Sequence, residues 1–499
     1  MEKYNKIQAE GYLQLPLCDK TVVTELSGDF TLPDYQPEIK RLLRVSASVL
    51  PPSKYIGDRD AEFAGSIDYY VIYTGSDNEL YCAPLTSEYK VNVPFEREGT
   101  EGSAVNPIGE IVTFTDMISG RVTAPRKISI KCRLRSRARI FGEMPLDYGF
   151  AEGDESIRVL NGEMKASRVL QSVSEHLELS DEMFCDNKES DLRVIFADGK
   201  VMMSEVSPSS GSVSCRGDVY LNLLLCREDG SRPYTAHRKL PFSCALSMDG
   251  VSTDCGVSAT GNVSEMNVTV DDGRIGIDVG VIVKAEACRD ENVSFIKDMF
   301  SVARRTENSY KDVSVPTVNL PIVGNFTLSD SLSLAESGIA ENAKIIDVCG
   351  SASVDEYSFE DGKCAASGKA KFSILADRDG EYSVSDLELP FSYRAPVNGE
   401  FDSASCYAEV VSARARVDGE RIGIDAEISV SGNAMKHSVA KMLCDVGFGN
   451  EIVRERGEYV ICYPSGDDSL WSVAKRYGAM PEKLIENNGL SGDVRLDSG

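Results

Sequence analysis

Two aspartates at matching places in the chain could act as a pair of catalytic carboxylates. Asp278 and Asp425 each end the same five-residue motif, Arg-Ile-Gly-Ile-Asp. Most glycoside hydrolases use two carboxyl groups. One protonates the leaving oxygen, and the other either attacks the sugar or activates a water molecule. The two motifs belong to different copies of a repeated unit, however, and Lys131 holds the place in a third copy. We therefore expect solvated strand positions here rather than a catalytic pair.

The other residues that could do chemistry are scattered along the chain. The three histidines, His176, His237 and His437, lie in different segments, and none has a cysteine at metal-ligand spacing. The 14 cysteines form no Cys-x-x-Cys pair, which favours free thiols in a reducing compartment. No phosphate-binding loop and no Gly-x-Ser-x-Gly elbow occur. The sequence thus predicts no enzyme activity, no metal and no cofactor.

The aspartate motif belongs to a long internal repeat. The sequence of residues 271–279 recurs at 418–426 and, with more substitutions, at 124–132. The aligned basic residues of the three copies are Lys127, Arg274 and Arg421, and each is 147 positions from the next. A constant period indicates tandem copies of one domain. Two further features recur with nearly the same period. They are the Pro-Phe pairs that end at Phe95, Phe242 and Phe391 and the glycines Gly65, Gly217 and Gly368.

Each copy reads as a set of antiparallel strands. After Gly65 the apolar residues Ile67, Tyr69, Val71 and Tyr73 alternate with others up to a polar turn at 75–78, and turns at 228–231 and 377–380 follow similar runs. Period-two alternation buries one face of a strand, and proline at the same strand end predicts a sheet margin there. Arg274 and Arg421 are expected as charges at hairpin ends.

These patterns predict a mainly β protein. We expect three tandem antiparallel β-sandwich or open-barrel-like repeats in a row, over residues 20–148, 167–304 and 317–434. A small α+β module should follow over 457–499. We further expect polar linkers at 147–156 and 305–316, a short helix at 37–43, and helical spacing at 435–443 that ends the β array.

Charge and composition limit the classes of partner that the protein is expected to bind. The chain carries 79 acidic against 53 basic residues, a net charge of −26 that repels phosphate backbones and anionic lipids. Nucleic acid is therefore not an expected partner. The basic run from Arg121 to Arg139 is the exception, and it reads either as one solvated strand face or as an anion or partner contact. No segment has the apolar length of a membrane span, so we expect a cytoplasmic protein.

The C-terminal module has recognisable helix signals. An expected strand at 459–463 precedes a helix that Asp468 or Ser469 caps and Gly478 ends. Pro481 opens a second helix that Asn488-Gly489-Leu490 closes. We expect Trp471, the only tryptophan in the chain, to pack with Leu470 and Ile485 in a mini-core.

This module resembles the LysM domain, with its Gly-Asp-Ser/Thr-Leu-Trp loop, its helix and its closing Asn-Gly-Leu turn. The family's second strand is absent, so we expect a truncated strand-helix-helix version. The resemblance implies a shallow groove for N-acetylglucosamine-containing glycans such as peptidoglycan precursors. Its residues would be Gly466, Asp467, Asp468, Ser469, Leu470, Asn488, Gly489 and Leu490.

A second motif points to a particular family of proteins. It is the order Leu-Pro-x-x-x-Pro-Glu-Ile within residues 32–45, in an acidic β repeat. Together with a C-terminal LysM, these residues resemble the SPOCS-domain proteins of spore-forming Firmicutes, the SipL and SpoVID type. That resemblance implies a non-enzymatic scaffold for spore coat assembly in the mother cell, at the forespore surface. Its implied partners are the coat ATPase SpoIVA or a peptidoglycan-type glycan, together with other coat proteins.

Two other functions stay open at this point. A cell-wall hydrolase, or its regulator, with LysM as targeting module would need an export signal and a pocket with paired acids or a metal triad. A plain peptidoglycan-binding protein would have no role in sporulation. The leading prediction remains a scaffold whose β repeats contact proteins and whose terminal module anchors the assembly.

Overall fold

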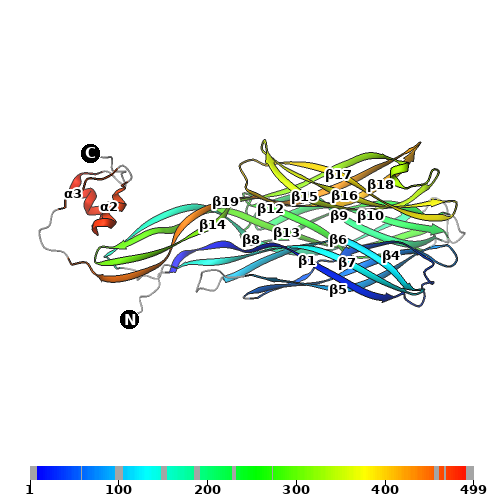
Figure 1. The fold of residues 1–499 in the computed structure, drawn as a ribbon, viewed down its shortest axis with the longest axis horizontal. Helices are drawn as coiled ribbons and strands as arrows, with labels where there is room; N and C mark the ends of the chain where they lie inside the picture. The colour runs from blue at the N-terminus through cyan, green and yellow to red at the C-terminus, as the bar shows by residue number, and fades with distance from the viewer. Residues whose placement is uncertain are drawn as a thin grey trace.

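The structure is a computed structural model that describes residues 8–57, 59–95, 105–147, 154–184, 192–227, 232–271, 273–453, 460–465 and 468–490. Most of these residues lie in long antiparallel strands, and the helices are short (Figure 1). The predicted mainly β fold with a small helical C-terminal module is confirmed.

The strands fall into three consecutive sets. The first repeat contains β1 (Gln8–Thr31), β2 (Arg41–Val49), β3 (Ser53–Ile56), β4 (Asp60–Thr74), β5 (Leu80–Pro94), β6 (Val105–Ala124) and β7 (Lys127–Asp147). The second contains β8 (Ile157–Phe184), β9 (Leu192–Ser209), β10 (Ser212–Arg227), β11 (Tyr234–Ser247), β12 (Gly256–Asp271) and β13 (Arg274–Ser301). The third contains β14 (Arg304–Ser333), α1 (Leu334–Ser337), β15 (Lys344–Glu360), β16 (Lys363–Arg378), β17 (Glu381–Pro396), β18 (Ser403–Asp418) and β19 (Arg421–Glu451). Two helices follow, α2 (Leu470–Tyr477) and α3 (Pro481–Asn488).

All three repeats have the same sheet topology. One sheet of each repeat pairs its first, last and penultimate strands, in the orders β1-β7-β6, β8-β13-β12 and β14-β19-β18. The other sheet centres on β4, β10 or β16, flanked by β5, β11 or β17 on one side and by β2 and β3, β9 or β15 on the other. Each repeat has its own hydrophobic core with side chains from both of its sheets. The repeats are therefore three copies of one two-sheet sandwich.

The repeated motif forms the turn of the last hairpin in each copy, joining β6 to β7, β12 to β13 and β18 to β19. The recurring prolines lie on edge strands, with Pro241 in β11 and Pro390 in β17, which confirms the expected sheet margin. Asp379 and Gly380, both at positive φ, make the tight turn between β16 and β17.

The repeats lie side by side (Figure 1), and each repeat contacts both of the others, so they surround a common axis rather than form a row. Two hydrophobic clusters draw buried side chains from all three repeats. The first, the hub cluster, contains Ile72, Leu80, Ile195, Phe196, Leu224, Cys226, Ile346 and Leu375. The second, the stalk cluster, lies where the long strands run on together and contains Leu13, Ala166, Val293, Phe295, Met299, Val313, Val315, Met442 and Leu443. The module with α2 and α3 lies at the end of this stalk (Figure 1).

Three expectations about local structure are wrong. The helix expected at 37–43 is absent, because β2 begins at Arg41 and pairs with β4. Residues 305–316 are part of β14, not a linker. The helical spacing at 435–443 lies in β19, where a bulge at Cys444 shifts the register and Met442 and Leu443 are both buried.

One marker of the repeat is also out of place. Phe242 and Phe391 lie opposite Gly217 and Gly368, whereas Gly65 faces Tyr89 in β5. Tyr89 therefore takes the place that we expected for Phe95. The domain limits stay a prediction, and strands β1, β8, β14 and β19 run beyond them.

Candidate functional site

The two helices of the C-terminal module begin and end as the sequence predicts. Ser469 caps α2 in a capping box with Ser472, and Gly478 ends the helix in the left-handed conformation. Pro481 opens α3, and Gly489, at φ 62°, ends it. Helices α2 and α3 pack against each other. The described part of the expected strand, Val460–Tyr463, is not assigned to a strand.

The first predicted glycan-binding loop is held by its own side chains. Asp468 accepts a hydrogen bond of 2.6 Å from Arg476 and one of 3.0 Å from the Ser465 amide. Arg476 lowers the pKa of Asp468 to about 2, with help from Ser465, so the carboxylate stays ionised. Leu470 is buried in the module core with Val473 and Ala474. Asp468, Ser469 and Leu470 thus shape the loop.

The second predicted loop is open to solvent. Asn488 is exposed and donates a hydrogen bond of 2.9 Å to the Leu484 carbonyl, and Gly489 is exposed beside it. Leu490 is half-buried. Gly466 and Asp467 lie outside the described residues. The structure places the two described loop segments at the start of α2 and the end of α3, and the glycan groove between them remains a prediction.

Trp471 contacts the stalk, and its expected packing with Leu470 and Ile485 stays a prediction. Its indole Nε1 donates a hydrogen bond of 2.8 Å to Asp298 in β13, and its ring packs edge-on against Phe300, with ring centroids 5.0 Å apart. Lys475, one turn further along α2, donates to Asp298 at 2.6 Å. The module is therefore docked on the stalk through the face of α2 that carries Trp471.

Asp298 is the centre of this docking contact. Its carboxylate also accepts hydrogen bonds from Asn308 and Tyr310 in β14, at 2.9 Å and 2.6 Å. Burial alone would raise the pKa of Asp298, but the hydrogen bonds from Lys475, Trp471 and Tyr310 hold it below its usual range. A second ion pair of 3.1 Å, from Arg158 in β8 to Glu482 in α3, supports the same docking.

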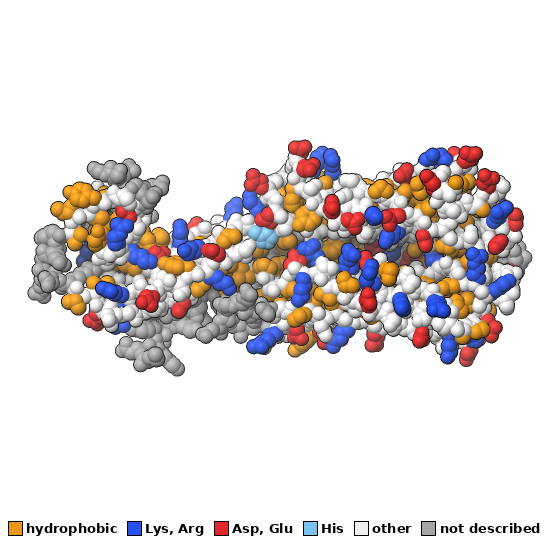
Figure 2. Space-filling model, viewed as in Figure 1, with side chains coloured by type: hydrophobic (Ala, Val, Ile, Leu, Met, Phe, Trp, Pro, Cys, Tyr) orange, Lys and Arg blue, Asp and Glu red, His pale blue; other side chains and the backbone are white. Residues whose placement is uncertain are grey.

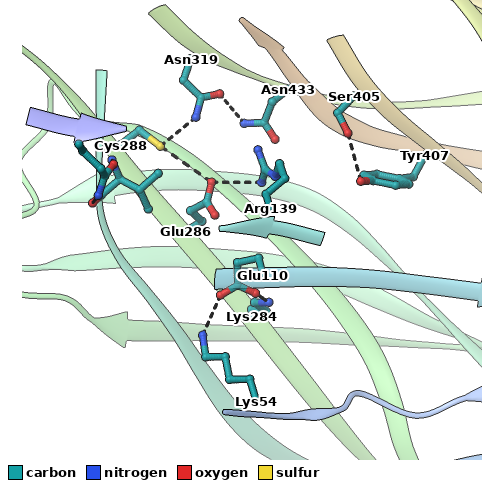
Figure 3. Close-up of polar contacts among 12 residues, drawn as sticks. Lys54, Glu110, Arg139, Lys284, Glu286, Cys288, Asn319, Ser405, Tyr407 and Asn433 are labelled. Atoms are coloured by element: carbon teal, nitrogen blue, oxygen red, sulfur yellow. Dashed lines mark hydrogen bonds and ion pairs between the residues drawn. The ribbon is translucent and has the colours of Figure 1, made fainter. Parts of the chain in front are cut away.

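A cavity of about 1630 Å³ lies between the three repeats. Its walls are mainly the inner edge strands β2, β6, β9, β12, β15 and β18. Figure 3 shows polar contacts that cross it between repeats. Glu110 pairs with Lys54 of its own repeat at 2.9 Å and with Lys284 of the second repeat, and Arg139 pairs with Glu286 at 3.5 Å.

Several acids in or beside this cavity form ion pairs with cations. Lys200 contacts Glu409 at 2.8 Å, which raises the pKa of Lys200 despite burial. Burial alone would raise the pKa of Asp347, but Arg44 holds it below its usual range. Paired carboxylates of this kind join repeats and favour a structural role over the paired acids of a hydrolase.

The other candidates are also bound to neighbours within the chain. Asp278 and Asp425 accept hydrogen bonds of 2.7 Å from Ser180 and Ser329, each within its own repeat. Both aspartates therefore fit ordinary strand positions. The described cysteines are all free, and no group of three or more metal-ligating side chains occurs among the described residues.

Most of the basic run from Arg121 to Arg139 lies on β7, where its side chains form one partly exposed strand face. Its arginines alternate with buried residues and pair with acids, Arg133 and Arg135 with Asp116 and Arg137 with Asp19. Arg139 reaches the second repeat instead. An anion or partner contact of this strand face stays a prediction.

The docking residues could not be located from the sequence. Asp298, Phe300 and Arg158 lie more than 160 residues before the helices that they contact, and no motif marks them. The lone tryptophan was the only available signal. An exposed aromatic on a small helix needs apolar cover, and the stalk supplies it.

Comparison with known families supports the two sequence resemblances. Residues 192–271, from β9 to β12 of the second repeat, match the model described as SipL, SPOCS domain. Residues 465–499 match the LysM domain model. No curated protein and no solved structure matches the chain significantly. Among the described residues, no helix has the length and apolar character to span a membrane. The chain thus combines a SPOCS-domain match in its second repeat with a LysM match at its C-terminal end, the architecture that the sequence resemblance predicts.

Proposed function

We propose that this protein is a non-enzymatic scaffold of spore coat assembly, which its LysM module anchors to a coat ATPase of the SpoIVA type or to a peptidoglycan-type glycan. The observation that carries the proposal is the pairing of the two family matches in one chain. The docked module adds support, because a binding module fixed at the end of a long stalk holds the body in a defined direction from its anchor.

The surface of the body suits contacts with other proteins. Acidic and basic side chains are interspersed over the face that Figure 2 shows, with scattered hydrophobic groups between them. Mixed charge of this kind favours specific, electrostatically matched partners over nucleic acid or anionic lipid. We place the protein in the mother cell, at the forespore surface, with other coat proteins as partners of the repeats.

The anchoring role is tested by binding of the purified full chain to a SpoIVA-type ATPase and to an N-acetylglucosamine polymer. N488A and G489A alter the exposed loop at the end of α3, while E486A changes a neighbouring exposed residue of the same helix as the matched control. We expect loss of binding in the first two variants only. Binding that all three variants retain would remove the loop from the anchor.

The same preparation separates the scaffold from the cell-wall hydrolase. The full chain is incubated with peptidoglycan, and released reducing ends are measured over time. A scaffold releases none above a boiled control. Release that depends on Asp198 or Glu409, the acids beside Lys200 in the cavity, would instead establish the hydrolase.

A further inference from the structure

The inner edges of the three repeats carry different residues at equivalent positions. In each repeat a β-bulge inserts one extra apolar residue, and these residues are Leu43, Ile195 and Ile346. All three pack in or against the hub cluster. Because the bulge recurs at the same place, the next residues are structural equivalents. They are Arg44, Phe196 and Asp347.

The strand opposite confirms this equivalence. Arg44, Phe196 and Asp347 pair with the buried residues Ile72, Leu224 and Leu375, which lie at the same distance from Gly65, Gly217 and Gly368. One position of the sandwich is thus cationic in the first repeat, aromatic in the second and anionic in the third.

The charges at this position join two repeats. Arg44 and Asp347 form a buried ion pair, with side chains 4% and 0% exposed. Asn222 of the second repeat also donates to Asp347, at 2.8 Å. Phe196 packs edge-on against Tyr70 of the first repeat, with ring centroids 5.0 Å apart. The ion pair marks the interface between the first and third repeats.

A second set of equivalent positions marks another interface. Arg139, Glu286 and Asn433 are separated by 147 positions each and occupy the same place in β7, β13 and β19. Here the charges are positive, negative and neutral, and Arg139 pairs with Glu286 at 3.5 Å across the first and second repeats (Figure 3). Asn433 bonds instead to Asn319 of its own repeat, at 2.8 Å.

The remaining interface has an ion pair that the others lack. Lys200 in β9 pairs with Glu409 in β18, which joins the second and third repeats. The counterparts of these two residues, read from the strand registers, are Ser48 with Asn262 and Ser351 with Phe114. Neither counterpart pair carries opposite charges.

We infer that these ion pairs form an address code, in which each inner edge fits one particular repeat of the same chain and so fixes the order of the repeats around the axis. Three copies of one sandwich share an apolar hub and could otherwise associate equally well with copies in another chain. A contact of the first or third repeat with its own kind would bring two arginines or two aspartates together in a buried site. Unpaired buried charge is strongly unfavourable, so wrong pairings are rejected.

The inference goes beyond the scaffold function and does not depend on it. It predicts that charge reversal at one address changes which chain supplies the neighbour. R44D places two acids together, and D347R places two cations together, yet each variant complements the other. We test this with the full chain in two tagged forms, unfolded in denaturant and refolded together, with mixed-tag oligomers measured by tandem purification and light scattering.

The expected result is several-fold more mixed-tag oligomer from R44D refolded with D347R than from either variant alone or from the original chain. The double variant R44D/D347R restores the pair within one chain and should refold like the original. The idea is overturned if the mixture exchanges no more than the original chain, or if the double variant is as impaired as the single ones.

Two further tests separate the choice of neighbouring repeat from the stability of the fold. R44M/D347N removes both charges while the amide keeps its bonds to Asn222 and Thr235. This variant should remain folded but form more mixed-tag oligomer, because a neutral pair does not disfavour contact with a repeat of another chain. An unchanged amount of mixed-tag oligomer would contradict the inference. As a control, K369E refolded with E388K alters an exposed pair whose side chains are 53% and 44% exposed, and it should leave exchange unchanged.

Discussion

The body and the docked module are held in place in different ways. The three repeats share two apolar clusters and have a different ion pair at each interface, and the Arg44–Asp347 pair is buried. Among the described residues, the module is held mainly by the contact between Trp471 and Phe300, by the bonds to Asp298 and by the exposed ion pair of Arg158 with Glu482. Burial over many residues makes the body cooperative, whereas a contact centred on Asp298 can open without disturbing the strands. The difference separates a cooperative three-repeat body from a module whose docking contact has few members.

The largest expected effect tests the body. Leu224→Ala removes a side chain that is 0% exposed at the centre of the hub cluster. We expect a loss of about 2–5 kcal/mol in the free energy of unfolding, since a cavity remains in the buried cluster. Urea unfolding followed by circular dichroism measures this loss. Val439→Ala, at a side chain that is 69% exposed, is the control and should cost little.

The second prediction concerns the docking carboxylate. Asp298→Asn removes the charge that binds Lys475 and the indole of Trp471. Docking should weaken by about 1.5 kcal/mol, near the lower end for hydrogen bonds to charged groups because the site is partly exposed. Trp471 is the only tryptophan, so its fluorescence reports the contact directly, and we expect a red shift and stronger acrylamide quenching.

The control for this variant is Glu307→Gln, an exposed acid on β14 near the same site. Its tryptophan spectrum should match that of the original chain. Circular dichroism of Asp298→Asn should show an intact body. A loss of strand signal in that variant would mean that the docking contact and the body form a single cooperative unit.

The third prediction is a pH dependence of docking. The pKa of Asp298 in the docked state is lower than that of an exposed aspartate. The docked state therefore binds fewer protons than the released state. The stabilisation is therefore complete above the ordinary aspartate pKa and is lost as the pH falls through the lowered value. Acid titration of Trp471 fluorescence should show release before the body unfolds. A spectrum that stays constant until global unfolding would contradict this.

The smallest effect is expected at the helix cap. Ser469→Ala removes the side chain that accepts from the Ser472 amide at the start of α2. The cost should be about 1 kcal/mol of module stability, with no change in the stability of the body. Tryptophan fluorescence in urea follows the module, and circular dichroism follows the strands. Ser472→Ala, which removes the other half of the capping box, should have a smaller effect of the same sign.

The sequence predicted the features that depend on local periodicity. Gly478, Pro481 and Gly489 marked the helix ends, and the period of 147 marked the hairpins, because caps and turns need particular residues at fixed positions. Alternation failed where bulges broke it, as at Cys444, and the resulting spacing imitated a helix.

The arrangement of the repeats depended on contacts that no local pattern contains. Arg44 and Asp347 are 303 positions apart, and their pairing follows only from the equivalence of two bulges. One signal was present in the sequence. The unbroken run Leu223-Leu224-Leu225 indicates a strand buried on both faces, as in β10, where the second face meets the other repeats.

Amide hydrogen exchange of the full chain tests the central comparison most directly. The central strands β4, β10 and β16 should be protected to a similar degree and lose protection together, because they share the hub cluster. Amides of α2 and α3 should exchange earlier, and faster still in Asp298→Asn. Loss of protection one repeat at a time, or protection of α2 equal to that of β10, would contradict a closed three-repeat body with a separately docked module.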